Sequence, residues 1–370
     1  MKIYQVGGSV RDALLGRAVV DRDYVVVGAT PDELIAQGYK PVGRDFPVFL
    51  HPQTHEEYAL ARTERKTAPG YQGFVFHTEP TVTLEEDLAR RDFTVNAMAQ
   101  GKDGAIVDPY NGQADLKAGV LRHVGPAFAE DPVRILRAAR FAARFGFTIA
   151  PETLALMRKM ADNGEVDALV PERVWQEVAR GLMEADPVRM FATLDECGAL
   201  ARALPEFMPW AADAANMRAL AYSATQEATL PVRFAACAGA LGEERIARLC
   251  ERVRVPVDCR DLALIHARNA EAFAQAATLD ATGLAGLVQR CDGLRQPERF
   301  VSLIAVAQAY AQGARGDTAY AEGVRRLRLG LAAVRGIDAG AIARTQPNPQ
   351  AINAALQVAR IAAIAAALGG

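Results

Sequence analysis

Gly7-Gly8-Ser9-Val10-Arg11-Asp12, followed at Asp21-Arg22-Asp23 by the apolar run Tyr24-Val25-Val26-Val27, is the strongest structural signal in the sequence. Two glycines ahead of an apolar-periodic run predict a loop that enters a helix, whose first free N–H groups favour a phosphate. The apolar run predicts a buried strand. Side chains two residues apart on a strand share a face, so Asp21 and Asp23 are expected side by side at its entrance.

Two adjacent carboxylates repel each other unless a cation lies between them. A hard divalent ion such as Mg²⁺ takes oxygen ligands and shares its other positions with water and substrate phosphates. We therefore expect Asp21 and Asp23 to bind Mg²⁺ for phosphoryl or nucleotidyl transfer. Gly-Gly and Asp-x-Asp are each common in solvated turns, but their order and closeness favour the functional interpretation. Neither a P-loop nor a Gly-x-Gly-x-x-Gly dinucleotide motif is present.

Composition is typical of a soluble globular protein, with 370 residues, 51% of them hydrophobic and 23% charged. The length predicts two or three domains. A net charge of −2 means that an RNA partner would be held by a local basic patch. Five scattered cysteines, without Cys-x-x-Cys, predict free thiols in a reducing cytoplasm. No signal peptide is expected, and the polar interruptions of Ala351–Leu368 predict a core-facing helix and no membrane partner.

Strands and helices alternate up to about residue 125, and helices follow almost without a break. The pattern predicts a helix at Pro31–Gly38, and strands at Ile3–Val6, Asp21–Gly28, Phe46–Leu50 and Glu57–Arg62. The polar, glycine-bearing stretch Thr63–Pro80 predicts a long loop that acts as a lid or binding loop.

Two further segments carry candidate chemistry. Period-two alternation could bring Glu57 near the aspartate pair as a third acid, the alternative being a solvated edge strand. Arg90-Arg91-Asp92-Phe93-Thr94-Val95-Asn96 can supply phosphate and ribose partners, the alternative being a solvated helix face.

Asp131-Pro132 predicts the start of a helix, with Asp131 as its N-cap. Arg134, Arg137, Arg140 and Arg144 share one side of this helix, opposite an apolar side. Such a stripe, without acidic residues at i+4, repels itself, so we expect it to face an anion; a solvated face is the alternative.

Five motifs occur in an order and at a spacing that resemble the class II tRNA nucleotidyltransferases, the bacterial CCA-adding enzymes of the polymerase-β-like superfamily. The motifs are Gly7-Gly8-Ser9-Val10-Arg11-Asp12, Asp21-x-Asp23, Arg90-Arg91-Asp92-Phe93-Thr94-Val95-Asn96-Ala97, Asp108-Pro109-Tyr110-Asn111-Gly112 and Glu130-Asp131-x-x-Arg134-x-x-Arg137-x-x-Arg140-Phe141. The likeness covers about the first 200 residues.

The resemblance implies an α+β fold: a polymerase-β-like nucleotidyltransferase head (1–125, a mixed sheet with helices), then an all-α neck that selects the base (126–205) and an all-α body and tail that bind tRNA (206–370). It also implies a Mg²⁺-dependent cytoplasmic enzyme that adds C, C and A to the tRNA 3′ end from CTP and ATP. The oligomeric state is not implied.

The resemblance also assigns roles to individual residues. Asp21 and Asp23 match the catalytic metal ligands, and Glu57 matches the acid of the family's Glu-x-x-x-x-Arg strand. The residues that match nucleotide contacts are Gly8 and Arg11 in the triphosphate loop, Arg91, Asp92, Arg137 and Arg140, and the base-selecting pair Asp131 and Arg134. Cytosine and adenine both present an amino donor beside a ring-nitrogen acceptor, so a carboxylate and a guanidinium suit both bases.

The second half departs from many relatives, in which a His-Asp phosphohydrolase domain follows the head. Cys237-Ala238-Gly239-Ala240-Leu241-Gly242 stands where that signature would fall, so we expect no phosphatase or phosphodiesterase activity. Three alternatives remain: a bacterial poly(A) polymerase, a relative that adds only CC or only A, and an inert RNA-binding protein. A poly(A) polymerase is expected to be more basic at Val42–Phe49, and a CC-only enzyme to differ at Thr63–Pro80.

Overall fold

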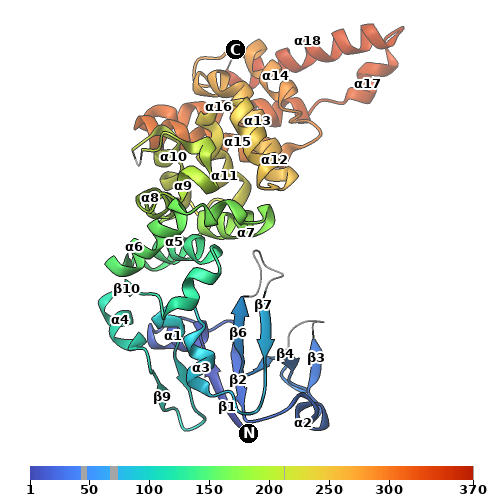
Figure 1. Ribbon diagram of the computed structural model, residues 1–370. Coiled ribbons are helices and arrows are strands. Elements are labelled where there is room, and N and C mark those ends of the chain that lie inside the picture. Colours follow the sequence, from blue (N-terminus) through green and yellow to red (C-terminus); the bar gives the residue numbers. More distant parts are fainter. Residues whose placement is uncertain (43–47, 67–73, 212, 370) are drawn as a thin grey trace. The chain divides into compact units, whose positions relative to one another are not determined.

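The computed structural model describes residues 1–42, 48–66, 74–211 and 213–369, and the chain divides into two compact units (Figure 1). Unit 1 comprises Met1–Val174 and Thr193–Ala203, and unit 2 comprises Trp175–Ala192 and Leu204–Gly370. The expected division into head, neck and body remains a prediction, and each unit is described separately.

Unit 1 contains a seven-stranded sheet within the described ranges, in the order β3-β4-β5-β2-β1-β8-β9. β2 and β5 pair in parallel, whereas the other neighbours pair antiparallel, so the mixed sheet and the α+β fold class are confirmed. The strands are β1 (Lys2–Val6), β2 (Asp23–Val27), β3 (Lys40–Val42), β4 (Val48–Leu50), β5 (Glu57–Leu60), β8 (Ala99–Gln100) and β9 (Ile106–Val107).

The central strand β2 is covered on both faces. Val25 packs in a cluster with Val6 and Leu88, and Val26 packs in a second cluster with Phe49 and Leu60. The expectation of a buried strand is therefore confirmed. Because β2 begins at Asp23, the expected strand is shorter at its start, and Asp21 precedes it.

The stretch Thr63–Pro80 is not a simple loop. Its ends form the antiparallel strands β6 (Thr63–Lys66) and β7 (Phe74–His77) of a separate two-stranded sheet. The run Phe74-Val75-Phe76 consists of aromatic and β-branched residues that favour strands, and this propensity outweighed the polar composition of the stretch. The expected loop is thus wrong for Thr63–Lys66 and Phe74–His77, and residues 67–73 lie outside the described residues.

Helices flank the sheet and continue beyond it in unit 1. α2 and α3 begin with capping boxes, Thr30 with Glu33 and Thr83 with Glu86. The helices that lie wholly in unit 1 are α1 (Gly8–Leu14), α2 (Pro31–Ala36), α3 (Leu84–Ala89), α4 (Gly112–Ala118), α5 (Val133–Phe145), α6 (Pro151–Asp162) and α9 (Leu200–Ala203), with 3₁₀ turns at Thr94–Asn96, Pro126–Glu130 and Glu165–Ala168 and a small parallel pair β10 (Val120–Leu121) and β11 (Thr148–Ile149). Two helices are shared between the units: α7 (Pro171–Leu182) begins in unit 1 and continues in unit 2, and α8 (Pro187–Glu196) begins in unit 2 and ends in unit 1.

In unit 2 the described elements are helical. They are α10 (Ala215–Thr225), α11 (Leu230–Ala238), α12 (Glu243–Arg252), α13 (Val257–Ala274), α14 (Ala281–Arg290), α15 (Pro297–Gln308), α16 (Ala321–Arg335), α17 (Ala339–Arg344) and α18 (Pro349–Leu368), with 3₁₀ turns η5 (Pro205–Phe207), η6 (Gly239–Leu241) and η8 (Thr318–Tyr320) and a π-helix, η7 (Ala309–Ala314).

The last helix departs from the expectation. α18 packs against α14 and α16, yet Ile364 is its only fully buried residue among those described, so it faces the core only in part. The helix is long and apolar enough to cross a membrane, contrary to the sequence estimate, although one such helix is weak evidence of a membrane span.

Candidate active site

Asp23 lies where the ends of three strands of unit 1 meet. It is the first residue of β2 and pairs with Val6, the last residue of β1, and with Glu57, the first residue of β5. The turn Gly7-Gly8 follows β1 directly. The glycine turn, the aspartate and the glutamate therefore lie at the same end of neighbouring strands.

The aspartate pair is the candidate metal site. Desolvation raises the pKa of Asp23, the negative charge of Asp21 raises it further, and the positive charge of Arg91 lowers it. The two carboxylates thus repel each other. Among the described residues, no group of three or more His, Cys, Asp or Glu side chains is arranged to hold a metal ion, so Glu57 does not form such a group with Asp21 and Asp23. Two exposed carboxylates with oxygen donors suit a hard divalent cation that retains water or phosphate ligands.

The glycine turn allows an arginine to approach closely. Gly7 has a φ of +72°, in the left-handed region that favours glycine. A Cβ atom built on Gly7 would lie 2.7 Å from Nη1 of Arg91. The absence of a side chain at Gly7 therefore leaves room for the guanidinium whose charge acts on Asp23.

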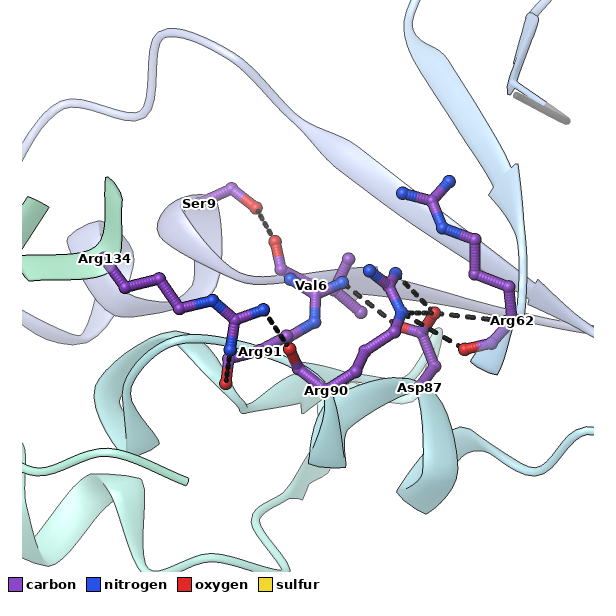
Figure 2. Close-up of polar contacts among 7 residues, drawn as sticks. All are labelled: Val6, Ser9, Arg62, Asp87, Arg90, Arg91 and Arg134. Carbon is purple, nitrogen blue, oxygen red and sulfur yellow. Dashed lines mark hydrogen bonds and ion pairs between the residues drawn. The ribbon is translucent and has the colours of Figure 1, made fainter. Parts of the chain in front are cut away.

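A buried carboxylate holds the two adjacent arginines (Figure 2). Arg90 Nη2 donates to Asp87 Oδ1 at 2.7 Å, and Arg91 Nη2 donates to Asp87 Oδ2 at 3.2 Å. Burial raises the pKa of Asp87, but the two arginine charges and the hydrogen bonds outweigh burial and hold it below its usual range. Sequence analysis did not single out Asp87, although its spacing of three and four residues from the arginines was a usable signal.

A second polar network joins α1, the Thr94–Asn96 turn and α5. Arg11 donates to Asn96 Oδ1, and Asn96 Nδ2 donates to Asp92 Oδ1 at 2.9 Å. Arg137 donates to Asp92 Oδ2 through Nε at 2.8 Å and pairs with it through Nη2 at 2.7 Å. Burial raises the pKa of Asp92, but Arg137, Asn96 and Arg134 together lower it to about 2. Asp92 is therefore ionised and fixed in place.

Arg11 itself is almost fully buried, with 4% of its surface exposed. It pairs with Asp12 at 2.8 Å, and its guanidinium lies 4.7 Å from the centre of the Phe145 ring. For Arg11 to bind a triphosphate, its guanidinium would therefore have to move away from Asp12 and Phe145, or the phosphate would have to enter the buried position that the guanidinium now occupies. The role of Arg11 as a triphosphate ligand remains a prediction.

The arginine stripe of α5 faces protein groups. Arg137 meets Asp92, and Arg144 Nη2 lies 3.2 Å from Asp12 Oδ2. Arg140 is buried, with its guanidinium 4.4 Å from the centre of the Phe141 ring. At Arg137 and Arg144 the expected anion is thus an aspartate of this chain that lies far away in the sequence. The alternative prediction, that the arginines form a solvated helix face, is wrong.

The base-selecting candidates lie at the start of α5. The helix begins at Val133, one residue later than expected, and Val133 N donates to Asp131 Oδ1 at 3.2 Å. Arg134 Nη2 donates to the carbonyl oxygen of Arg90 at 2.8 Å (Figure 2). Arg173, which sequence analysis missed, binds both oxygens of Asp131, at 3.0 and 2.8 Å. This pair joins residues 42 positions apart, so no local pattern could have revealed it.

Comparison with known proteins settles the family. Residues 3–122 match a family model described as the poly A polymerase head domain, and residues 146–210 match one described as a probable RNA and SrmB-binding site of polymerase A. The multifunctional CCA protein of Burkholderia lata is 54% identical over 409 aligned positions, which cover 100% of this chain and 99% of that protein. This chain belongs to the CCA-adding tRNA nucleotidyltransferases.

Solved structures of CCA-adding enzymes share the fold. The Bacillus stearothermophilus CCA-adding enzyme in complex with CTP has a TM-score of 0.70 at 25% identity, and the alignment covers 97% of this chain and 87% of that enzyme's chain. The Thermotoga maritima CCA-adding enzyme complexed with tRNA_CCA has a TM-score of 0.73 at 22% identity, and the alignment covers 97% of this chain and 86% of that enzyme's chain.

The chain is shorter than its CCA-adding relative. The 409 positions aligned with the Burkholderia lata protein include all 370 residues, so about 39 of them are gaps in this chain.

Proposed function

We propose that this chain adds C, C and A in turn to the 3′ end of tRNA, with CTP and ATP as substrates and pyrophosphate as the second product. The observation that carries the proposal is the 54% identity, over the whole chain, to a protein named as a CCA protein. Unit 1 contains side chains that suit this reaction: an aspartate pair, a glycine turn and a helix that carries arginines. The bacterial relatives and the free cysteines support a cytoplasmic enzyme.

Asp21 and Asp23 would hold Mg²⁺. The fit rests on their oxygen donors and on the raised pKa of Asp23, which desolvation raises most and to which the charge of Asp21 adds, so a bound cation would relieve both effects. When bound, divalent cations would activate the tRNA 3′-hydroxyl and neutralise the departing pyrophosphate. Arg91, beside Gly7, is placed to contribute a positive charge to the same region. Glu57, in register with Asp23, would act as a further acid close to this pair.

The nucleotide would be read by Asp131 and Arg134. Each carboxylate oxygen has two acceptor sites, so Asp131 can accept from the amino group of cytosine or adenine while it remains bound to Arg173. Arg134 would donate to the adjacent ring nitrogen. Uracil and guanine present a carbonyl beside a ring N–H, so they would leave these charged groups unpaired, which can cost a factor of roughly 10⁴ in discrimination.

A second candidate is a bacterial poly(A) polymerase, which the match of residues 3–122 to the poly A polymerase head domain favours. The segment expected to be basic in that enzyme includes residues 43–47, which lie outside the described residues. A CC-only enzyme would be expected to differ at Thr63–Pro80, of which residues 67–73 also lie outside the described residues.

One incorporation assay separates these functions. Purified protein, Mg²⁺ and a tRNA that ends before CCA are incubated with each labelled nucleotide in turn. Incorporation of C, C and A followed by arrest supports the proposal, runs of A support the poly(A) polymerase, and no incorporation supports an inert RNA-binding protein.

A matched pair of variants tests the metal site. Asp21→Ala should abolish incorporation while tRNA binding persists, since metal ligands serve chemistry and basic residues serve phosphate contacts. The control is Asp32→Ala, which removes an exposed carboxylate from α2 and should leave incorporation unchanged. Full activity of Asp21→Ala would contradict the proposed metal site.

A further inference from the structure

Unit 2 contains a small pocket at the position where a His-Asp signature would fall. Its volume is about 150 Å³, and we call it the His266 pocket. It is lined by residues from η6, α13, α15, η7 and the segment after η7, namely Gly239, Ala240, His266, Ala270, Phe273, Ala274, Ala307, Tyr310 and Arg315. Five of these nine residues are alanine or phenylalanine, so the walls are mainly apolar.

The Nδ1 atom of His266 is a buried polar atom without a hydrogen-bond partner among the described residues. His266 is 4% exposed, and its ring is stacked between the rings of Phe273 and Tyr310, at 5.7 and 5.3 Å. No described residue pairs with its Nδ1 atom. Burial, with a smaller effect from the charge of Arg315, lowers the pKa of His266 to about 4, so the ring is neutral at pH 7. An unpaired buried polar atom destabilises the protein, and a ligand that forms the missing hydrogen bond would recover that loss.

The missing side chain at Gly239 keeps the inner end of the pocket open. A Cβ atom built there would lie 2.9 Å from Tyr310 Oη and 3.3 Å from His266 Nδ1. Tyr310 Oη already donates to the carbonyl oxygen of Ala236 at 2.7 Å, so it retains only acceptor capacity. Two polar atoms therefore converge on one small space. A hydroxyl group there can both donate and accept, so it satisfies His266 in either tautomer.

The mouth of the pocket is cationic. Arg315 is exposed, and its guanidinium makes no ion pair with any carboxylate of the described residues. The lining contains no aspartate or glutamate. A ligand that reaches from the inner end to the mouth would thus pass from a hydroxyl site, through apolar walls, to a site for an anion.

We propose that the His266 pocket binds a small hydroxy acid, whose hydroxyl group meets His266 Nδ1 and whose carboxylate or phosphate meets Arg315. The volume limits the body of the ligand to about one ring, because an apolar cavity of about 150 Å³ accommodates benzene. All residues of the pocket belong to unit 2, whereas the candidate catalytic residues Asp21 and Asp23 belong to unit 1.

Titration calorimetry with three probes tests the proposal on the full-length protein at pH 7.5. 4-Hydroxybenzoate carries both groups, benzoate lacks the hydroxyl, and phenol lacks the anion. We expect 4-hydroxybenzoate to bind at least tenfold more tightly than either of the others. A phosphate-bearing analogue, 4-hydroxyphenyl phosphate, distinguishes the two anions. Equal binding of the first three probes, or no binding of 4-hydroxybenzoate and its phosphate analogue, would overturn the proposal.

Variants at the rim locate the binding without disturbing the core. Arg315→Gln should weaken 4-hydroxybenzoate about tenfold, since a hydrogen bond to a charged group contributes about 1.5–3 kcal/mol. Ala270→Leu, at an exposed wall position, should fill the pocket and abolish binding. The matched control is Arg328→Gln, an exposed arginine of α16 that does not line this pocket. Each variant is first checked for an unchanged circular dichroism spectrum and melting temperature. Unaltered binding in both rim variants would place the ligand elsewhere.

Discussion

Replacement of Asp92 by Asn is expected to destabilise the link between the sheet and α5. The pKa of Asp92 falls from 3.8 to about 2 on folding. Each pKa unit corresponds to about 1.4 kcal/mol, so the ionised carboxylate contributes about 2 kcal/mol to the free energy of folding at neutral pH. Asn keeps the shape of the side chain but removes the charge that Arg137 contacts through two nitrogens. Loss of one partner of a buried pair costs about 3–5 kcal/mol, and the partial exposure of Arg137 favours the low end. We expect a loss of about 2–3 kcal/mol.

Hydrogen exchange measured by mass spectrometry suits this prediction, because it reports on α5 separately from unit 2. A loss of about 2 kcal/mol should raise the exchange rate of α5 amides about 30-fold, whereas the control Asp32→Asn should leave it unchanged. The variant Arg137→Gln and the double variant complete a mutant cycle. Additive effects of the two single changes would refute the reasoning, because the network then contains no coupled pair.

The same pair predicts a pH dependence with a definite sign. The pKa of Asp92 is lower in the folded protein, so its stabilisation is fully present above the unfolded pKa of about 3.8 and is lost as the pH falls towards about 2. The stability difference between the wild-type protein and Asp92→Asn should therefore shrink as the pH falls from about 5 to about 2. A difference that stays constant over this range would show that packing and not charge explains the cost.

Three further outcomes are expected. Gly7→Ala should lower activity strongly, because its Cβ would meet a guanidinium at 2.7 Å, whereas Gly16→Ala, also at positive φ but with nothing within 4 Å, should cost only about 1–2 kcal/mol of stability; equal activities would contradict this. Arg173→Gln should raise misincorporation of UTP relative to CTP about tenfold, because it frees Asp131 to turn, and unchanged base selection would exclude a positioning role. Thiol reagents at pH 8 should modify none of the cysteines before unfolding, because all are buried and burial raises their pKa values; rapid labelling would contradict this. The cysteines are Cys197, Cys237, Cys250, Cys259 and Cys291.

Local patterns predicted the centre of the fold well. The apolar run after Asp23 is a buried strand, and Glu57, on the neighbouring strand β5, is in register with Asp23. The role of Glu57 as a third acid remains a prediction. These features depend on residues close together in the sequence. The prediction of a loop from Thr63 to Pro80 was wrong because Phe74–His77 pairs with Thr63–Lys66, and this pairing leaves no signal in the polar composition of the stretch.

The partners of the arginine stripe could not be predicted. Arg137 meets a carboxylate 45 residues away and Arg144 one 132 residues away, and neither pairing leaves a periodic signal in the chain. The sequence showed that four arginines share a side of the helix, but the fold determined which anions they meet. The catalytic and nucleotide-binding roles of the candidate residues remain predictions, which the incorporation assay and its variants address.

The ion pairs between α5 and two aspartates of unit 1 determine where the chain can be truncated to give a stable catalytic fragment. The head-domain match ends at residue 122, before α5 begins, so a fragment designed from that match would include Asp12 and Asp92 but neither of the α5 arginines that pair with them, Arg144 and Arg137. It would also lose the ring of Phe145 that covers Arg11. An autonomous catalytic fragment for structural work should therefore extend at least through residue 146, where the glycine cap ends α5.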